Sequence, residues 1–153
     1  MGKLPDEDNI YVREGGGTLQ DSLAFLLKNL EEMNRSWIRI KKEADKLVAK
    51  KLMAQSLVVM TSLKGLTLDI YEKELLPKLI EIIFAYNDPL SQEFLLENII
   101  NIFPEDYNIK CMESILVTMS KLVEGVNIKK LFILLLDKLS SYIENMQKEG
   151  QEE

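Results

Sequence analysis

The chain has 153 residues, 46% hydrophobic and 29% charged, which is enough for one folded domain with a core. It contains one cysteine and no histidine. This excludes an intrachain disulfide, Ser-His-Asp or Cys-His catalysis, and zinc sites built on histidine. The formal net charge of -6 lies mostly at the ends, since residues 18–143 keep 17 of the 25 acids and 16 of the 19 bases. A nearly neutral body argues against general nucleic-acid binding.

The two ends are expected to lie outside the folded part. Residues 1–17 hold Pro5, an acidic run at residues 6–8 and three glycines at residues 15–17, all of which disfavour a helix. We expect an extended or disordered tail over residues 1–17, helices over residues 18–147 and a frayed tail over residues 148–153. With no signal peptide and no apolar run near ~18 residues, the protein is expected to be soluble and cytoplasmic.

A first helix is predicted from Thr18 to about Ile40. Thr18 can serve as its N-cap, and Asp21 three residues later gives a sequence close to a capping box. Apolar residues then recur every three or four positions, at Leu19, Leu23, Leu26, Leu27, Leu30, Met33 and Trp37. Trp37 is therefore expected in the core, although tryptophan is also a common interface anchor, with Asn34 and Arg35 beside it as a polar rim.

A turn is predicted within residues 41–46, followed by a second helix from about Asp45 to Leu63. Gly65 is expected to end this helix, and Thr67 to cap the next one. Residues 35–51 carry an unusual excess of basic side chains, namely Arg35, Arg39, Lys41, Lys42, Lys46, Lys50 and Lys51. We interpret them as a solvated corner between helices. The alternative is a surface for an acidic partner or an anionic membrane.

Four further helices are predicted by caps and breakers. They cover residues 68–86 with a bend at Pro77, 89–103 capped by Asp88, 109–123 capped by Asn108, and 128–146 capped by Asn127 after Gly125. Short links and the lack of any strand pattern indicate an all-α chain of about six antiparallel helices. The last helix is apolar almost all round in its first half, which favours a HEAT/armadillo-like α-solenoid segment over a closed bundle.

The side chains that could take part in catalysis all have ordinary structural interpretations. Glu93 and Glu97 share a helix face, and we expect them to be solvated surface charges rather than an acid–base pair. Cys111 is expected to be a small core residue, because a nucleophilic thiol needs a base. We expect no enzyme, no cofactor and no metal.

Several segments resemble one known family in order and rough spacing. In the first helix, the matching positions are Asn29, Glu32, Met33, Asn34, Trp37 and Arg39. A longer stretch, residues 91–107, reads Ser-Gln-Glu-Phe-Leu-Leu-Glu-Asn-Ile-Ile-Asn-Ile-Phe-Pro-Glu-Asp-Tyr. Residues 4–6, 125–129 and 136–139 also fit. Together they resemble the large scaffold subunit of the retromer coat, vacuolar protein sorting-associated protein thirty-five. The charged link between the first two helices is shorter here than in that family.

The resemblance implies an internal piece of the N-terminal half of a long α-solenoid. Its implied function is non-enzymatic scaffolding in endosome-to-Golgi and recycling transport, peripheral on endosomal membranes. The implied partners are the arrestin-like and phosphoesterase-like retromer subunits, bound mostly through regions outside this segment, together with sorting nexins and cargo tails. The candidate partner-facing residues are Asn29, Glu32, Asn34, Arg35, Trp37 and Arg39.

Two other interpretations remain open. One is an unrelated HEAT/armadillo-type adaptor that binds peptides in a groove. The other is a closed bundle with an enzymatic site built from buried carboxylates, which the missing histidine disfavours. We also expect the helix over residues 128–146 to expose an apolar face through which copies of the chain self-associate.

Overall fold

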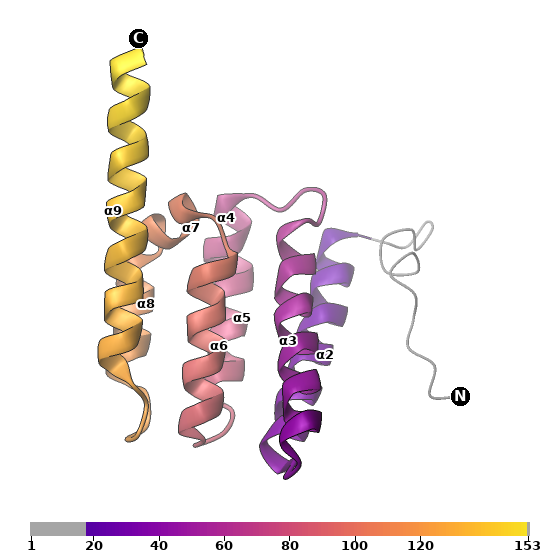
Figure 1. The fold of residues 1–153 in the computed structure, drawn as a ribbon. Coiled ribbons are helices and arrows are strands. Elements are labelled where there is room, and N and C mark those ends of the chain that lie inside the picture. Colours follow the sequence, from indigo (N-terminus) through magenta and orange to yellow (C-terminus); the bar gives the residue numbers. More distant parts are fainter. Residues whose placement is uncertain (1–17, 153) are drawn as a thin grey trace. The chain divides into compact units, whose positions relative to one another are not determined.

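The computed structural model describes residues 18–152, and every regular element among them is a helix (Figure 1). The chain divides into two compact units, Met1–Thr67 and Leu68–Glu153. The tail predicted for residues 1–17 lies outside the described residues. For the described part of the chain, the predicted all-α fold class is confirmed.

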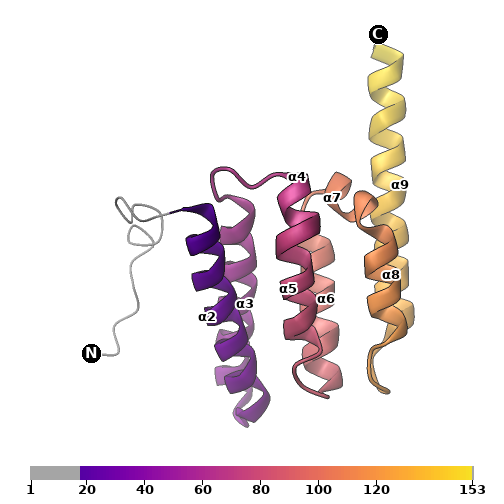
Figure 2. The ribbon, with the colours of Figure 1, turned by 180° about the vertical axis from the view of Figure 1, so that it is seen from behind.

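The first unit is an antiparallel hairpin of α2 (Leu19–Arg39) and α3 (Glu43–Thr61) (Figure 2). The predicted capping box is confirmed: the Asp21 N–H donates to Thr18 Oγ1 at 3.0 Å, and the Thr18 N–H donates to the Asp21 carboxylate at 3.5 Å. The core-facing side chains are Leu23, Leu26, Leu30 and Trp37 of α2, with Met53, Leu57 and Met60 of α3. The capping box therefore starts α2 with its apolar stripe turned toward α3.

The break between the two helices falls slightly earlier than predicted. Residues 40–42 leave the helix, and α3 begins at Glu43 instead of near Asp45. Glu43 and Asp45 then both lie in the first turn of α3, where a negative charge complements the helix dipole. The predicted turn is confirmed, and so is the stop at Gly65, whose φ of 93° is a left-handed conformation that favours glycine.

The second unit begins with a continuous rod made of α4 (Leu68–Ile70), a π-helical segment η1 (Tyr71–Leu75) and α5 (Leu76–Ile83). The Leu76 N–H donates to the Tyr71 carbonyl, five residues back. The wide turn comes directly before Pro77, which has no N–H and would crowd the carbonyl four residues earlier in a regular helix. The sequence predicted a bend at Pro77, and the structure shows this widened turn directly before it.

The next helix, α6 (Pro89–Ile102), begins as predicted, with the Ser91 N–H donating to Asp88 Oδ1 at 2.9 Å. One prediction after it is wrong. Asn108 does not cap a helix of residues 109–123, because it is fully buried inside α7 (Glu105–Lys110) and donates from Nδ2 to the Ile100 carbonyl at 2.7 Å. Pro104 and two acids start α7 early, and a break at Cys111 separates it from α8 (Met112–Ser120).

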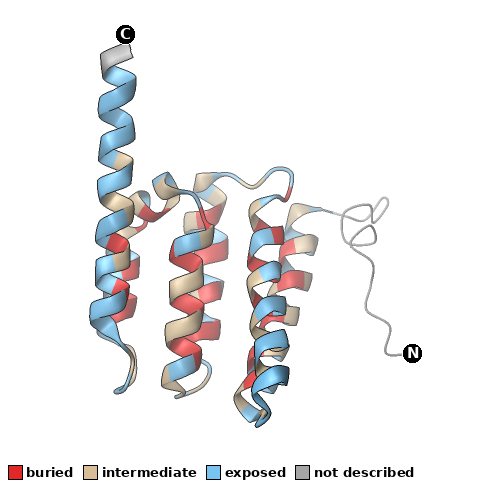
Figure 3. Cartoon of the chain, viewed as in Figure 1, coloured by how far each residue is buried: buried red, intermediate tan, exposed pale blue. Residues whose placement is uncertain are grey.

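The last helix, α9 (Ile128–Glu152), packs against α6 and α7. Gly125 has a φ of 104°, and Asn127 Oδ1 accepts from the Lys130 N–H at 3.0 Å, so the predicted stop and cap are confirmed. The helix continues past the predicted end at Met146, because its polar C-terminal residues are mostly good helix formers. Its C-terminal half extends beyond the other helices of the unit (Figures 1 and 3).

Candidate functional site

One side of the α2–α3 hairpin is hollowed into a groove of about 570 Å³. Its apolar lining includes Met33 of α2 and the exposed side chains of Val48 and Leu52, which are 56% and 45% exposed. Polar side chains of Asn29, Glu32, Ser36, Asp45, Gln55 and Ser56 also line it. The groove can therefore receive apolar side chains of another segment, and it places the carboxylates of Glu32 and Asp45 beside them.

The six predicted partner-facing residues do not form one surface. Asn29 and Glu32 line the groove, and Arg35 and Arg39 are exposed. Asn34 and Trp37 are 0% and 3% exposed, on the side of α2 that forms the core. The expectation that Trp37 belongs to the core is confirmed.

The alternative interpretation, in which Asn34 forms a polar rim beside an interface tryptophan, is wrong because Asn34 is buried. At ~100° of rotation per residue, Asn34 falls on the same stripe of α2 as Leu30 and Trp37. These residues are buried together.

Trp37 has a second role that sequence reasoning missed. The ammonium groups of Lys46 and Lys50 lie 5.9 Å and 5.5 Å from the centre of the Trp37 ring. These two lysines are one helical turn apart on α3, and a cation over an aromatic face is attracted by the ring electrons. Part of the basic stretch is therefore structural. Its other members are exposed, namely Arg35, Arg39, Lys41, Lys42 and Lys51.

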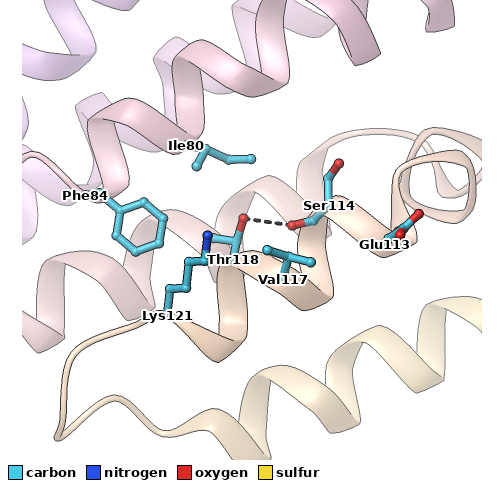
Figure 4. Close-up of a pocket in the computed structure, with 7 residues that line it drawn as sticks. All are labelled: Ile80, Phe84, Glu113, Ser114, Val117, Thr118 and Lys121. Carbon is cyan, nitrogen blue, oxygen red and sulfur yellow. Dashed lines mark hydrogen bonds between the residues drawn. The ribbon is translucent and has the colours of Figure 1, made fainter.

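A second, smaller pocket of about 400 Å³ lies between α5 and α8 (Figure 4). Its middle is formed by Ile80 and Val117, with the Phe84 ring at one end. Lys121 lies at the Phe84 end and Glu113 at the opposite end, so the pocket carries opposite charges at its two ends. Between them, the Thr118 hydroxyl donates to the Ser114 carbonyl of its own helix at 2.8 Å (Figure 4).

The carboxylates of Glu93 and Glu97 are engaged in structure. The Lys130 ammonium lies 3.3 Å from Glu93 and 3.0 Å from Glu97, and both carboxylates are largely covered. The expectation that they are simply solvated is wrong, because the start of α9 approaches α6 at this point. They join two helices and do not form an acid–base pair.

No metal or thiol chemistry emerges from the described residues. Within residues 18–152, no three histidine, cysteine or acidic side chains are grouped so that they could hold a metal ion. Burial raises the pKa of the Cys111 thiol to about 11, with a smaller contribution from the nearby Glu72 charge. The thiol is therefore protonated at neutral pH and is a poor nucleophile. None of the helices in residues 18–152 has the length and apolar character that crossing a bilayer requires.

Comparison with known proteins gives one consistent result. A family model described as vacuolar protein sorting-associated protein 35 matches residues 1–153. The chain is 31% identical over 150 residues to vacuolar protein sorting-associated protein 35B of Arabidopsis thaliana, covering 92% of this chain and 19% of the relative. A Dictyostelium discoideum relative, vacuolar protein sorting-associated protein 35, is 29% identical over the same coverage. The corresponding protein of Schizosaccharomyces pombe is 32% identical over 138 residues, 84% of this chain and 16% of the relative. The chain thus spans about a fifth of the length of these relatives.

Proposed function

The chain belongs to the family of vacuolar protein sorting-associated protein 35, and on that premise we propose that it serves as a length of helical scaffold in a retromer-type coat. Such a coat sorts membrane proteins at endosomes for retrieval to the Golgi or for recycling. The observation that carries the proposal is the family match along residues 1–153. It agrees with the described residues, whose regular elements are all helices.

The mechanism we propose is geometric, and side chains that join non-neighbouring segments support it. In the second unit, Gln92 of α6 bonds to the link before α6 through the Tyr86 carbonyl at 3.2 Å, and to the link between α8 and α9 through the Val123 N–H at 2.8 Å. Glu93 and Glu97 hold the start of α9 through Lys130. Such cross-links stiffen a stack of helices, and a stiff stack keeps its partners at fixed distances.

The partners we propose are those of the retromer scaffold. They are the arrestin-like and phosphoesterase-like subunits, sorting nexins and cargo tails, which would hold the chain on the cytoplasmic side of endosomal membranes. Most of these contacts would lie outside this segment. Within it, the candidate contact residues would be Asn29 and Glu32, which line the α2–α3 groove, and the exposed Arg35 and Arg39.

A chimera tests the proposal. The matching segment of the Schizosaccharomyces pombe relative would be replaced by this chain, with a segment-deletion chimera as the control. We expect the chimera to restore sorting of a vacuolar protein and to retain both partner subunits on co-precipitation. A chimera that accumulates to the normal level, keeps its partners and still missorts the vacuolar protein would contradict the proposal.

A second candidate function rests on the α5–α8 pocket. An adaptor that binds peptides would use the opposite charges at the two ends of this pocket, Lys121 and Glu113. In the chimera, Lys121→Glu would then abolish sorting, whereas a pure spacer tolerates this change because Lys121 is exposed. The matched control is Lys78→Glu, an equally charged change at an exposed residue of α5 that does not line the pocket.

A further inference from the structure

The closed end of the α2–α3 hairpin is strongly basic. The chain turns there at residues 40–42, between the last turn of α2 and the first turn of α3 (Figure 2). Residues 35–51 form this basic tip, and they carry seven bases and two acids. Five of the bases are exposed, namely Arg35, Arg39, Lys41, Lys42 and Lys51.

The charge of the basic tip is opposite to that of the rest of the chain. Residues 18–67 carry nine bases and five acids, whereas residues 68–153 carry eight bases and sixteen acids. The whole chain has a net charge of -6. A concentration of positive charge in one part of an acidic chain indicates a surface that meets an anionic partner.

The turn at the basic tip would stay open in a longer stack of helices. Successive helix pairs of a solenoid pack along the sides of one another. Arg39, Lys41 and Lys42 lie instead at the end of a pair, where the chain passes from one helix to the next. Their exposure therefore does not depend on where the sequence begins or ends.

We propose that the basic tip binds directly to the surface of an anionic membrane. The placement of the charges favours this partner over a peptide. The groove on the same hairpin is lined by two charged side chains, and both are acidic, Glu32 and Asp45. The bases lie on both helices and on the turn that joins them, so they enclose no binding site but can meet a broad layer of lipid phosphates.

An exposed aliphatic side chain accompanies these charges. Leu47 is 54% exposed and does not line the groove. Lys50 and Lys51 follow it by three and four residues, which places them beside it on α3. Leu47 can therefore enter the headgroup layer while the neighbouring ammonium groups stay among the phosphates. Nucleic acid is a poorer match, because the one aromatic residue of the basic tip, Trp37, is 3% exposed and cannot stack on a base.

Flotation of the chain with lipid vesicles tests the proposal. It needs no coat partner, so its failure would leave the scaffold proposal standing. We expect the chain to float with vesicles of equal parts phosphatidylserine and phosphatidylcholine, in spite of its net charge of -6, and not with vesicles of phosphatidylcholine alone. Binding should weaken as salt is added, because salt screens the attraction.

A charge-reversing variant and a matched control assign the binding to the basic tip. Lys41→Glu/Lys42→Glu should raise the lipid concentration needed for half binding by at least about tenfold. Its helical circular dichroism should not change, because both side chains are exposed. Lys78→Glu/Lys148→Glu alters the net charge equally at two exposed residues of the second unit and should bind like the wild type.

A wild-type chain that does not float with the anionic vesicles would overturn the proposal, as would a tip variant that binds like the control. Binding of a polyglutamate peptide through Lys41 and Lys42, without flotation, would assign the basic tip to an acidic protein instead. Leu47→Gln should weaken flotation severalfold, because the aliphatic side chain gains from entering lipid. Unchanged flotation of this variant would overturn the insertion of Leu47.

Discussion

Glu93 of α6 accepts a hydrogen bond through Oε1 from the N–H of Asn127, 34 residues later and directly before α9, at 2.9 Å. Its other carboxylate oxygen accepts from the Lys130 ammonium at 3.3 Å. One side chain thus satisfies a backbone donor at the start of α9 and neutralises a nearby cation. This explains why α9 begins where it does and against which helix.

Removing this carboxylate should loosen the start of α9. We expect Glu93→Ala to lower the free energy of unfolding by about 1 kcal/mol, chiefly through the bond to Asn127, since a partly exposed ion pair contributes little. Urea unfolding at neutral pH measures it. The matched control is Asp69→Ala, which removes an exposed ion pair with Lys73 within one helical rod and should change little.

The stability that the ion pair between Lys130 and Glu93 contributes should depend on pH. The hydrogen bond with Glu97, and after it the bond with Glu93, raises the pKa of Lys130, although burial opposes the rise. A raised lysine pKa stabilises the fold below the usual value of 10.5, and this contribution is lost as pH rises through the folded-state pKa. The difference between wild type and Glu93→Gln should therefore shrink above that pH. A difference that grows would contradict the ion pair.

Gln92 should matter more than its neighbours. It is 0% exposed and satisfies a carbonyl in one loop and an N–H in another. Gln92→Leu keeps the size but leaves both of these partly buried backbone groups without their partner, so we expect a loss of about 1–3 kcal/mol in the free energy of unfolding. Asn98→Leu is the control, because the Asn98 side chain bonds only to the Phe94 carbonyl of its own helix. Equal losses in the two variants would contradict the bridging role.

The contrast between these residues shows what the sequence can predict. The caps at Thr18, Asp88 and Asn127 were predictable because cap and helix are neighbours in the chain. Gln92 and Glu93 were not, because their partners lie 31 and 34 residues away. Asn108 was assigned a local role as a cap, whereas it bonds to the preceding helix.

The same division applies to the candidate surfaces. Helical periodicity predicted that Trp37 is buried, because periodicity is a property of one helix. The lysines over its ring depend on how α2 and α3 pair, and so do the groove residues on α3. The pocket between α5 and α8 depends equally on tertiary packing. Sequence reasoning therefore found single helix faces and missed surfaces shared by two helices.

Trp37 offers a direct optical test of the first unit. It is the only tryptophan and is 3% exposed, so its emission should be blue-shifted and should move to longer wavelength on unfolding. Lys50→Met should lower the free energy of unfolding by about 0.5–1 kcal/mol through the lost cation–π contact. Lys51→Met, at an exposed neighbouring position, is the control. If the two variants unfold alike, the contact with Trp37 does not stabilise the fold.

Tyr71 should tolerate loss of its hydroxyl. Its ring is fully buried, with centroids 4.6 Å from Phe103 and 5.0 Å from Tyr107, and its hydroxyl has no hydrogen-bond partner among the described residues. Tyr71→Phe keeps the ring and removes an unsatisfied polar group. We expect unchanged stability or a gain of up to about 1 kcal/mol. Thermal unfolding measures it, and Tyr71→Leu, which removes the ring, should be destabilising. A clear loss in Tyr71→Phe would reveal a partner for the hydroxyl.

Cys111 should couple stability to alkaline pH. Its folded-state pKa of about 11 lies above the usual value of 9.0, chiefly because burial disfavours the thiolate. The stability that this difference contributes is complete below pH 9 and is lost as pH rises toward 11. Urea unfolding between these values should therefore show a falling free energy of unfolding, with a shallower fall in Cys111→Ala.

The thiol of the folded chain should also react slowly with a disulfide reagent at mildly alkaline pH, and unfolding in urea should accelerate the reaction. Equal reaction rates in the folded and unfolded chain would show that Cys111 is accessible, and the buried position of the thiol would then be wrong.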